Sequence, residues 1–446
     1  MVGRIGTGIR IPPRAYGKMH HFDRNSIQSA LASIESKRAT WLHVGEWFNP
    51  QAGSTKPNVH LVYDDSAFLH VSQNLPPAEL IQGINRIDLP EVTVLPPLFD
   101  AHTHISMCGG ELDADKRSTA LRRQPAEILA EATQRAQDIL AMGVFGMRDG
   151  GDKDGVGLQL STLTRLNCGK PQSSRVLSPG AGIHRHGRYG SFFSRPLEAH
   201  SSAADCVASR IAEGADHIKI VPTGIINFKK GAVTSAPQLS SDEVEALVLA
   251  AHKNNRMVMA HASGADGIAN AIKGGVDTIE HAYFVKKEQL ETMAKQGIVW
   301  VPTFAPVHRQ IVHADIMGWD ATTLGHLQRI LDDHAASLQY ALRLGVRVLV
   351  GSDAGSYGVP HALGLIEEMR LMEAAGMPTA TVLATACLHN ATTLLPHEVP
   401  PLIQVKHPAS FLLAPINVTK STAQLKNAIC ICNGQPLQPP SHIRLL

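Results

Sequence analysis

The chain has 446 residues, of which 44% are hydrophobic and 18% are charged, and its formal net charge is +2. This composition is typical of a globular protein and excludes a disordered chain. The balanced charge, without a cluster of lysines and arginines among aromatic residues, argues against a nucleic-acid partner. No apolar run reaches the roughly 18–20 residues that a membrane-spanning helix needs, so we expect no membrane partner.

The cysteines and the start of the chain favour a cytoplasmic protein. Six cysteines are scattered without a CxxC motif, which predicts reduced thiols. Residues 1–20 are basic but contain no apolar core, so a secretory signal is not expected. We interpret residues 1–39 as a loosely attached N-terminal extension, as is common at chain termini.

Both ends of the chain predict a small β-domain, because short β-branched and aromatic runs alternate there with turn residues. The predicted strands are residues 41–50, 58–65, 66–73 and 86–96 in the first part of the chain and residues 402–405, 410–416 and 428–437 near its end. The late runs resemble the early ones in composition. We therefore expect residues 40–95 and 397–446 to form one composite β-sandwich.

Between these parts, from residue 96 to residue 396, short β-branched runs alternate with longer helical patterns. This alternation is typical of repeated βα units around a parallel sheet. The predicted strands are residues 97–105, 144–152, 174–183, 216–224, 256–264, 277–284, 298–307 and 347–355, and the predicted helices are residues 125–143, 157–169, 203–215, 241–255, 266–275, 287–297, 321–345 and 362–376. Eight strands and eight helices predict an α/β fold, the (β/α)8 TIM barrel.

Six polar side chains follow apolar runs at the carboxyl ends of the predicted strands, where TIM barrels place their active sites. They are His102, His104, Lys219, His261, His281 and Asp353. Because side chains alternate along a strand, His102 and His104 point to the same side. Imidazole and carboxylate groups are the ligands that transition metals prefer. The six residues therefore predict a metal centre at the mouth of the barrel.

The ordered set of these six residues resembles the binuclear-metal amidohydrolase superfamily, and the match extends over nearly the whole chain. The segments "ADHIKIVPTG", "MAHASGADGIANAIKGGVDTIEHAYF" and "GSDAG" are most similar to the branch of imidazolonepropionases and prolidase-like Xaa-Pro or Xaa-Arg dipeptidases. The chain departs from the family pattern at Pro97 and Ala282, where relatives usually carry glycine.

The resemblance implies two divalent metal ions as cofactors. One ion would be bound by His102, His104 and Asp353, the second by His261 and His281, and Lys219, carboxylated by CO2, would bridge the two. An ammonium group beside two cations would be repelled, whereas a carbamate is an anionic ligand that spans metals about 3.5–4 Å apart. Imidazole with oxygen ligands suits zinc best.

The predicted chemistry is hydrolysis of an amide bond in a small substrate such as a dipeptide or an N-acyl amino acid. We expect a hydroxide that bridges the metals to attack the carbonyl carbon, because metal binding lowers the pKa of water from about 15.7 to about 7. Asp353 is the predicted catalytic base and then acid, which passes the proton to the leaving nitrogen. The resemblance also implies a homo-oligomer.

Substrate contacts are predicted at the mouth of the barrel. The candidates are His184, His186, Arg188, Tyr189, Tyr283 and His361, the last because relatives often carry a histidine there. Arg188, in the loop 182–196, would clamp a substrate carboxylate. The alternatives are a surface loop and, for Tyr283, a packing role. Arg148 lies at the end of the second strand, and two roles stay open for it, a substrate contact and a structural ion pair with Asp149.

Two other functions stay open on the sequence alone. The first is opening of a cyclic amide or deamination of a heterocycle, but those relatives mostly hold one metal and lack the strand-four lysine, so Lys219 argues against them. The second is a non-catalytic scaffold on the same barrel, which would have lost ligands, and none is missing here. Metal content separates the three functions, because it would be two, one or no equivalents.

Overall fold

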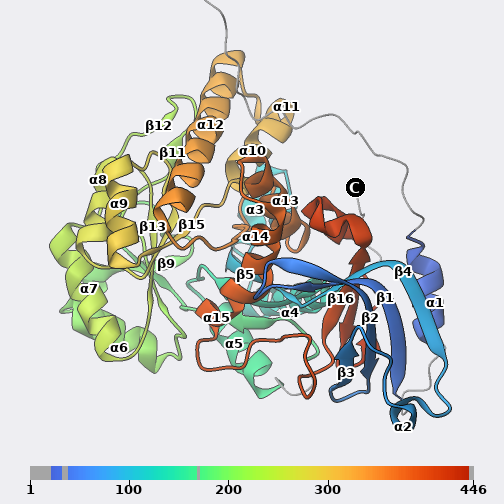
Figure 1. Cartoon of the computed structure of the whole chain (residues 1–446). Coiled ribbons are helices and arrows are strands. Elements are labelled where there is room, and N and C mark those ends of the chain that lie inside the picture. Colours follow the sequence, from blue (N-terminus) through green and yellow to red (C-terminus); the bar gives the residue numbers. More distant parts are fainter. Residues whose placement is uncertain (1–21, 33–38, 168–170, 441–446) are drawn as a thin grey trace, which may run out of the picture.

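The structure is a computed structural model and describes residues 22–32, 39–167 and 171–440. A β/α barrel and a curved sheet lie side by side, and segments from both ends of the chain meet in the sheet (Figure 1). Residues 1–21 and 33–38 of the predicted extension, Cys168 and residues 441–446 of the predicted β-domain lie outside the described residues. In the described parts, no helix has the length and apolar character to cross a membrane, and the five cysteines found there are free thiols.

The sheet domain is one mixed seven-stranded sheet with the order β18-β17-β16-β4-β1-β2-β3. Its strands are β1 (Thr40–Asn49), β2 (Ser54–Tyr63), β3 (Phe68–Ser72), β4 (Arg86–Leu95), β16 (Phe411–Pro415), β17 (Ile429–Cys432) and β18 (Gln435–Pro436), and the short helix α2 (Ala78–Ile81) precedes β4. Strand β4 joins the two chain ends, because it pairs in parallel with β1 and antiparallel with β16. The predicted composite sheet domain therefore draws on both ends of the chain.

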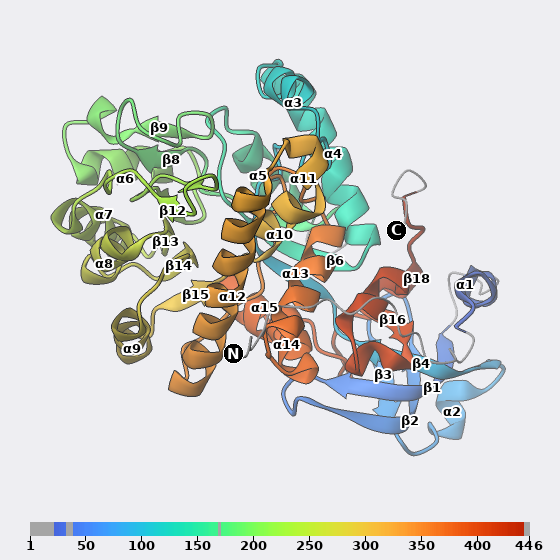
Figure 2. The ribbon, with the colours of Figure 1, turned by 90° about the horizontal axis from the view of Figure 1, so that it is seen from above.

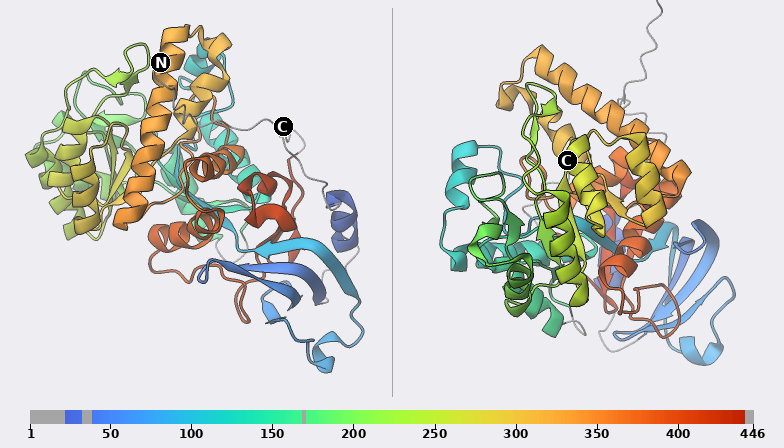
Figure 3. Two further views of the ribbon diagram at one scale, coloured as in Figure 1. Left: turned by 45° about the horizontal axis from the view of Figure 1, so that its top comes forward. Right: turned by 90° about the vertical axis from the view of Figure 1, so that its left-hand side faces the viewer.

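The two wings of this sheet face each other across an apolar core. The Phe411 ring on β16 lies 5.1 Å from the Tyr63 ring and 5.4 Å from the Phe68 ring, centroid to centroid. Helix α1 (Arg24–Ala32), at the edge of the sheet domain in Figure 3, buries Ile27 and Leu31 in the same core. The expectation of loose attachment is therefore wrong for this part of the extension.

The segment 402–405, predicted as a strand, is a loop instead. Ile403 is buried in the sheet core, but the segment leads into Lys406, whose φ of +73° ends any extended conformation. The Lys406 amide donates to the carbonyl of Phe68, so the loop is hydrogen-bonded to the edge strand β3. Ile403 therefore packs into the core although segment 402–405 forms no strand.

The barrel has the predicted βα order. The labelled strands are β5 (Leu98–Thr103), β6 (Val144–Asp149), β7 (Arg175–Leu177), β8 (Gly182–His184), β10 (Ile218–Ile220), β13 (Val258–Ala262), β14 (Thr278–His281) and β15 (Val299–Val301). The helices of the βα units are α4 (Pro125–Ala141), α5 (Val156–Leu166), α6 (Ala203–Ala212), α7 (Ser241–Lys253), α8 (Ala265–Lys273), α9 (Lys287–Gln296), α12 (Ala321–Leu344) and α13 (Leu363–Ala374), of which α13 follows the predicted eighth strand. Strands β7 and β8 are two pieces of the predicted third strand, interrupted at residues 178–181.

The predicted eighth strand, residues 347–355, closes the barrel through backbone hydrogen bonds. The Leu349 amide donates to the carbonyl of Trp300 on β15, and the Ala101 amide on β5 donates to the carbonyl of Val350, both at 2.9 Å. The parallel order β15-β14-β13-β10-β8 and the parallel pairs β5-β6 and β6-β7 complete the circuit. The predicted TIM barrel is confirmed.

Other short elements surround this frame. They are α3 (Ala114–Ala120), β9 (Ser194–Pro196), η1 (Leu197–Ala199), β11 (Ile226–Asn227), β12 (Ala232–Val233), α10 (Ala305–Val312), α11 (Ala314–Met317), α14 (Thr379–Ala384), η2 (Thr385–His389), α15 (Asn390–Leu394), η3 (Ile416–Thr419) and η4 (Thr422–Asn427). Seen from above, helices α6 to α9 lie on the side of the barrel away from the sheet domain, and α14 and α15 lie toward it (Figure 2).

Candidate metal centre

Three of the predicted ligands meet at the carboxyl end of the first strand. The Nε2 atoms of His102 and His104 each lie 3.5 Å from Oδ1 of Asp353, and all three residues are buried. One ligand atom from each lies within 4.8 Å of the others, an arrangement that suits a single metal ion. We call these residues the first ligand group.

Backbone pairing explains why these side chains converge. The Asp353 amide donates to the carbonyl of His102 at 2.8 Å, and the His104 amide donates to the carbonyl of Ala354, so the eighth strand is held in register with β5. Gly150, at the end of β6, lets the His104 ring lie against the backbone, because a Cβ there would be 2.5 Å from the ring. Gly150 is therefore needed for the close approach of the His104 ring.

The other three predicted ligands lie on neighbouring strands. Lys219 is on β10, His261 on β13 and His281 ends β14. The ring centroids of His261 and His281 are 4.6 Å apart, and the His281 centroid is 5.1 Å from that of His102. These residues, the second ligand group, therefore adjoin the first. The structure thus gathers all six predicted ligands at one end of the barrel.

The backbone is strained where these side chains are presented. Asp353 and His281 have φ values of +54° and +69°, and Ala282 and Thr303 have +52° and +53°. Residues with side chains rarely adopt this left-handed conformation, and such strain clusters at functional sites. Ala282, which follows the ligand His281, therefore adopts a conformation that favours glycine.

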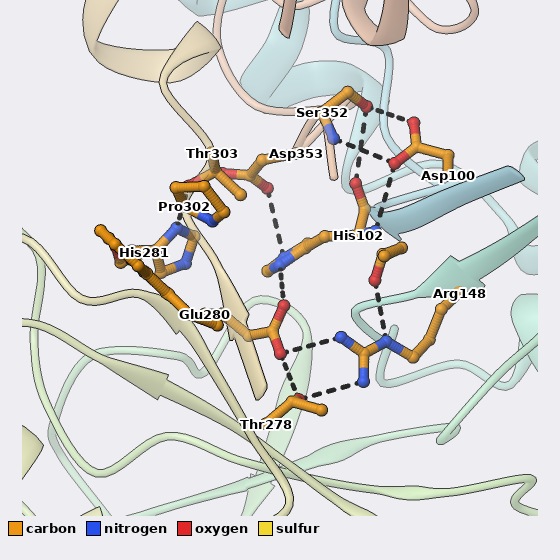
Figure 4. A network of polar contacts seen from close by, with 12 residues as sticks. Asp100, His102, Arg148, Thr278, Glu280, His281, Pro302, Thr303, Ser352 and Asp353 are labelled. Carbon is orange, nitrogen blue, oxygen red and sulfur yellow. Dashed lines mark hydrogen bonds and ion pairs between the residues drawn. The ribbon is translucent and has the colours of Figure 1, made fainter. Parts of the chain in front are cut away.

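A buried carboxylate that the sequence analysis missed fixes the orientation of His102 (Figure 4). Nδ1 of His102 lies 2.7 Å from Oε2 of Glu280, so the opposite nitrogen, Nε2, faces Asp353. Glu280 in turn accepts a hydrogen bond of 2.9 Å from Arg148, which also donates to Thr278 and to the carbonyl of Ala101. A carboxylate behind a ligating histidine fixes its tautomer and raises its basicity.

The predicted pair of Arg148 with Asp149 is wrong, because neighbouring residues of a strand point to opposite sides. Arg148 points into the barrel toward Glu280, whereas Asp149 accepts hydrogen bonds from the Ile105 amide and the Ser178 hydroxyl. Glu280 could have been recognised from the sequence, since it is an acidic residue inside an otherwise apolar strand run.

Asp100 is a second supporting carboxylate that sequence analysis missed. Its oxygens accept hydrogen bonds from the Ser352 hydroxyl at 2.5 Å, the Ser352 amide at 2.9 Å and the His102 amide at 3.2 Å. Asp100 therefore ties the strand of His102 to the residue that precedes Asp353, as the dashed lines in Figure 4 show. Asp100 lies in the same sequence motif as the ligands His102 and His104, two residues before the first of them.

Burial sets the protonation states of the ligands. Desolvation lowers the pKa of His104 and of His261 to about 3, and it holds the pKa values of His102 and His281 well below the ordinary value. It also lowers the pKa of Lys219 to about 8. Neutral imidazoles are the form that binds metals, and a lysine with a lowered pKa is a nucleophilic amine near neutral pH.

The ligand atoms of these residues are buried without hydrogen-bond partners, which bears on whether the residues fit metal ions. His102 Nε2, His261 Nε2, Lys219 Nζ and Asp353 Oδ1 are all buried and have no hydrogen-bond partner among the described residues. Leaving buried polar atoms unsatisfied is costly, so such atoms are expected to have partners. Nitrogen and carboxylate donors facing one another in this way fit divalent metals such as zinc.

A cavity of about 390 Å³ opens over both ligand groups. Of the predicted substrate contacts, Tyr189 and Tyr283 line it, although the Tyr283 hydroxyl donates to the carbonyl of Thr303 and the side chain is buried. The cavity also exposes Arg117 of α3, which sequence analysis missed because it lies on a short polar helix.

The remaining predicted contacts do not line this cavity. His184 is buried with Nδ1 2.9 Å from the Ser194 hydroxyl, and His361 has its Nε2 3.2 Å from the carbonyl of His104, outside the cavity. His186 is exposed, and Arg188, also exposed, donates to the carbonyl of Ala236. The structure therefore does not bring Arg188 to the position of a carboxylate clamp.

The sequence matches the model of the Amidohydrolase family over residues 93–397, more than half of the chain. This protein therefore belongs to the amidohydrolase family, and it is a hydrolase that acts on carbon–nitrogen bonds of small molecules. An ochratoxinase of Aspergillus niger is 26% identical over 405 residues, which cover 82% of this chain and 81% of that protein.

Solved structures of other proteins share the fold of this chain. A Xaa-Pro dipeptidase with bound methionine superposes with a TM-score of 0.73 and 23% identity, over 89% of this chain and 99% of that one. The A. niger ochratoxinase structure gives a TM-score of 0.71 and 20% identity, over 91% of this chain and 97% of that one. The predicted membership of the amidohydrolase superfamily is confirmed by the family match, and these structures show the same fold.

Proposed function

We propose that the protein hydrolyses an amide bond with a centre of two divalent metal ions, most suitably zinc. The observation that carries this proposal is the convergence of buried nitrogen and oxygen donors, without other partners, beneath the cavity. The first ligand group would hold one ion, and His261 and His281 would hold the second. A carboxylated Lys219 would supply the anionic oxygen ligand between these two groups.

Carboxylation of Lys219 is supported by its surroundings. Its amine is buried, has no hydrogen-bond partner among the described residues, and has a pKa lowered to about 8 by desolvation. The neutral amine attacks CO2, forms a carbon–nitrogen bond and releases a proton, which leaves an anionic carbamate. The carbamate would be held by the cations, whereas an ammonium group would be repelled by them.

Divalent ions bound in this way lower the pKa of water to about 7 and polarise the substrate carbonyl. The chain supplies proton transfer. Asp353, which lines the cavity beside His102 of β5 and His104 just after it, accepts the proton of the attacking water and donates it to the leaving nitrogen. Tyr283 also lines the cavity, whose lining is mostly apolar.

The experiment is metal analysis combined with a substrate screen. The protein is purified with zinc and bicarbonate and assayed against dipeptides, N-acyl amino acids, cyclic amides and aminated heterocycles. We expect two metal equivalents and turnover of acyclic amides that a chelator abolishes and zinc restores. One equivalent with turnover only of cyclic substrates, or no metal and no turnover, would contradict the proposal. A cytoplasmic location and a homo-oligomer remain expectations of the sequence.

A further inference from the structure

The loop that follows β15 carries Thr303, which supports the second ligand group. The Thr303 hydroxyl lies 2.7 Å from Nδ1 of His281, so the opposite nitrogen of that ring, Nε2, is left for a metal ion (Figure 4). The carbonyl of Thr303 also accepts a hydrogen bond of 2.5 Å from the Tyr283 hydroxyl. The hydroxyl of Thr303 is thus a neutral counterpart of the Glu280 carboxylate behind His102.

The backbone of Thr303 is held in an unfavourable conformation. Its φ is +53°, and a β-branched residue rarely adopts this left-handed region. Such a conformation persists only where the surrounding structure holds it. Groups outside Thr303 must therefore restrain the peptides on either side of it.

His334 of α12 contacts the peptide before Thr303. Its Nε2 lies 3.0 Å from the carbonyl of Pro302, and its side chain is buried. Burial lowers the pKa of His334 to about 4, so the ring is neutral near pH 7 and the nitrogen that faces the carbonyl carries its proton. The carbonyl of Pro302 and the amide nitrogen of Thr303 belong to one planar group, so this hydrogen bond restrains rotation at the φ of Thr303.

Other contacts of the loop lie beyond this peptide. The Glu368 carboxylate accepts hydrogen bonds from the two backbone amides that follow Thr303, at 2.9 and 2.7 Å. The Tyr283 hydroxyl reaches the carbonyl of Thr303, also on its far side. Glu368 and Tyr283 therefore restrain the peptides after Thr303, and His334 restrains the one before it.

Packing alone does not explain why residue 334 is a histidine. Its ring contacts those of Tyr283, Phe304 and Trp300, with centroids 4.3, 4.6 and 5.1 Å away. A phenylalanine ring would occupy the same space. The imidazole instead leaves its Nδ1 buried without a hydrogen-bond partner among the described residues, which costs stability. What the histidine adds is the hydrogen bond to Pro302.

We propose that His334 is a positioning residue for the second metal position. Its hydrogen bond to Pro302 keeps Thr303 in the left-handed conformation, and Thr303 then keeps Nε2 of His281 directed at the metal. Helix α12 thereby supports the site through the loop after β15. This inference rests on the proposed centre of two metal ions and adds a residue that supports one of its positions.

The test replaces His334 by phenylalanine, which keeps a ring but loses the donor, and by glutamine, which keeps an N–H donor but loses the ring. Metal-free protein is titrated in bicarbonate with zinc buffered by a chelator, and Lys219→Met identifies the second position as the one it loses. We expect His334→Phe to weaken the second position about two- to tenfold and to leave the first unchanged. His334→Gln should stay close to the wild type at both positions.

A double variant tests whether His334 acts through Thr303. Thr303→Val removes the hydroxyl beside His281, so the hydrogen bond of His334 has nothing left to position in that variant. His334→Phe combined with Thr303→Val should therefore weaken the second position no more than the larger of the two single losses. Losses that multiply would show two independent effects and would overturn the inference.

Stability separates positioning from packing. Denaturant unfolding of the metal-free proteins should find His334→Phe more stable than His334→Gln, because phenylalanine keeps the ring contacts. The order of zinc affinity at the second position is expected to be the reverse. His60→Phe removes another buried histidine, which accepts a hydrogen bond from Trp41 in the sheet domain, and this matched control should leave both zinc affinities unchanged.

Zinc affinities that follow the stabilities, with His334→Gln weaker than His334→Phe, would mean that the residue only packs, and the inference would fail. An unchanged second position in His334→Phe would also overturn it, while leaving the centre of two metal ions intact. A wild-type protein that binds fewer than two zinc ions would instead overturn the proposed function, which is a different result.

Discussion

The first and second ligand groups differ in what holds their side chains in place. In the first group, His102 is fixed by the Glu280 carboxylate at 2.7 Å, and Glu280 is itself anchored by Arg148. In the second group, Nδ1 of His281 contacts only the neutral hydroxyl of Thr303, also at 2.7 Å. Lys219 reaches the centre with an amine that has no partner among the described residues.

We infer from this difference that the first proposed metal position depends on carboxylate support of a histidine, and the second on the chemical state of Lys219. A carboxylate-supported histidine is preorganised for its metal, and removing such support costs metal affinity. In the proposed centre, His102 of the first position is oriented by the fold. The second position would lack its anionic ligand until Lys219 is carboxylated, so its occupancy should follow CO2 and pH.

The largest effect is expected from Asp353→Asn, which removes the proposed proton-transfer group, the base and then the acid of the reaction. We expect kcat to fall about 10²- to 10⁴-fold, as is typical of a lost general acid–base. Much of the metal should remain bound, because the histidines and Lys219 are unchanged. Steady-state kinetics with metal analysis measures both quantities, and a variant that retains substantial kcat would remove Asp353 from this role.

Lys219→Met should reduce the metal content from two equivalents toward one and abolish most activity. A short carboxylate such as acetate, added at high concentration, should restore part of the activity by supplying the missing anion. In the wild-type protein, the pKa of about 8 means that the reactive neutral amine increases as pH rises through 8. Reconstitution of metal-free protein with zinc and bicarbonate should therefore fill the second position faster at pH 8.5 than at pH 6.5.

Glu280→Gln should weaken metal binding at the first position about 10- to 100-fold, because it removes the charge behind His102. Competition with a chelator measures this affinity. Glu368→Gln is a matched control, since Glu368 is also buried but accepts hydrogen bonds from the Phe304 and Ala305 amides and contacts no ligand. Equal changes in the two variants would show that Glu280 acts through stability alone.

The smallest effect is expected from Thr303→Val, which removes the hydroxyl beside His281 and keeps the shape of the side chain. A lost neutral hydrogen bond corresponds to about a two- to tenfold weaker second metal position. A loss as large as that of Glu280→Gln would contradict the contrast between the two ligand groups.

The ligands could be predicted because each lies where an apolar strand run meets the barrel mouth. Their support could not be predicted in the same way. Glu280 stands out as an acidic residue in an apolar strand run, and Asp100 lies in the motif of His102. Their partners, His102 and Ser352, are seen only in the folded barrel. The orientation of Arg148 depends on which face of β6 points inward, which the local pattern left ambiguous.

The substrate-binding residues were predicted least well, because loop positions depend on packing rather than on periodicity. Arg188 seemed suited to a carboxylate, but the structure places it at the surface, while Arg117 of the short helix α3 lines the cavity. In the sheet domain, the segment 402–405 had strand-like composition, yet its apolar side chain serves as a core contact in a loop.

The central claim is that a carboxylated Lys219 joins two metal ions beneath the cavity. It is tested most directly by reconstituting the protein with zinc and isotope-labelled bicarbonate and then measuring zinc content and the NMR signal of the labelled carbon. The account predicts two zinc equivalents and a carbamate signal that is absent from Lys219→Met. One equivalent or less, with no carbamate signal in the active enzyme, would contradict it.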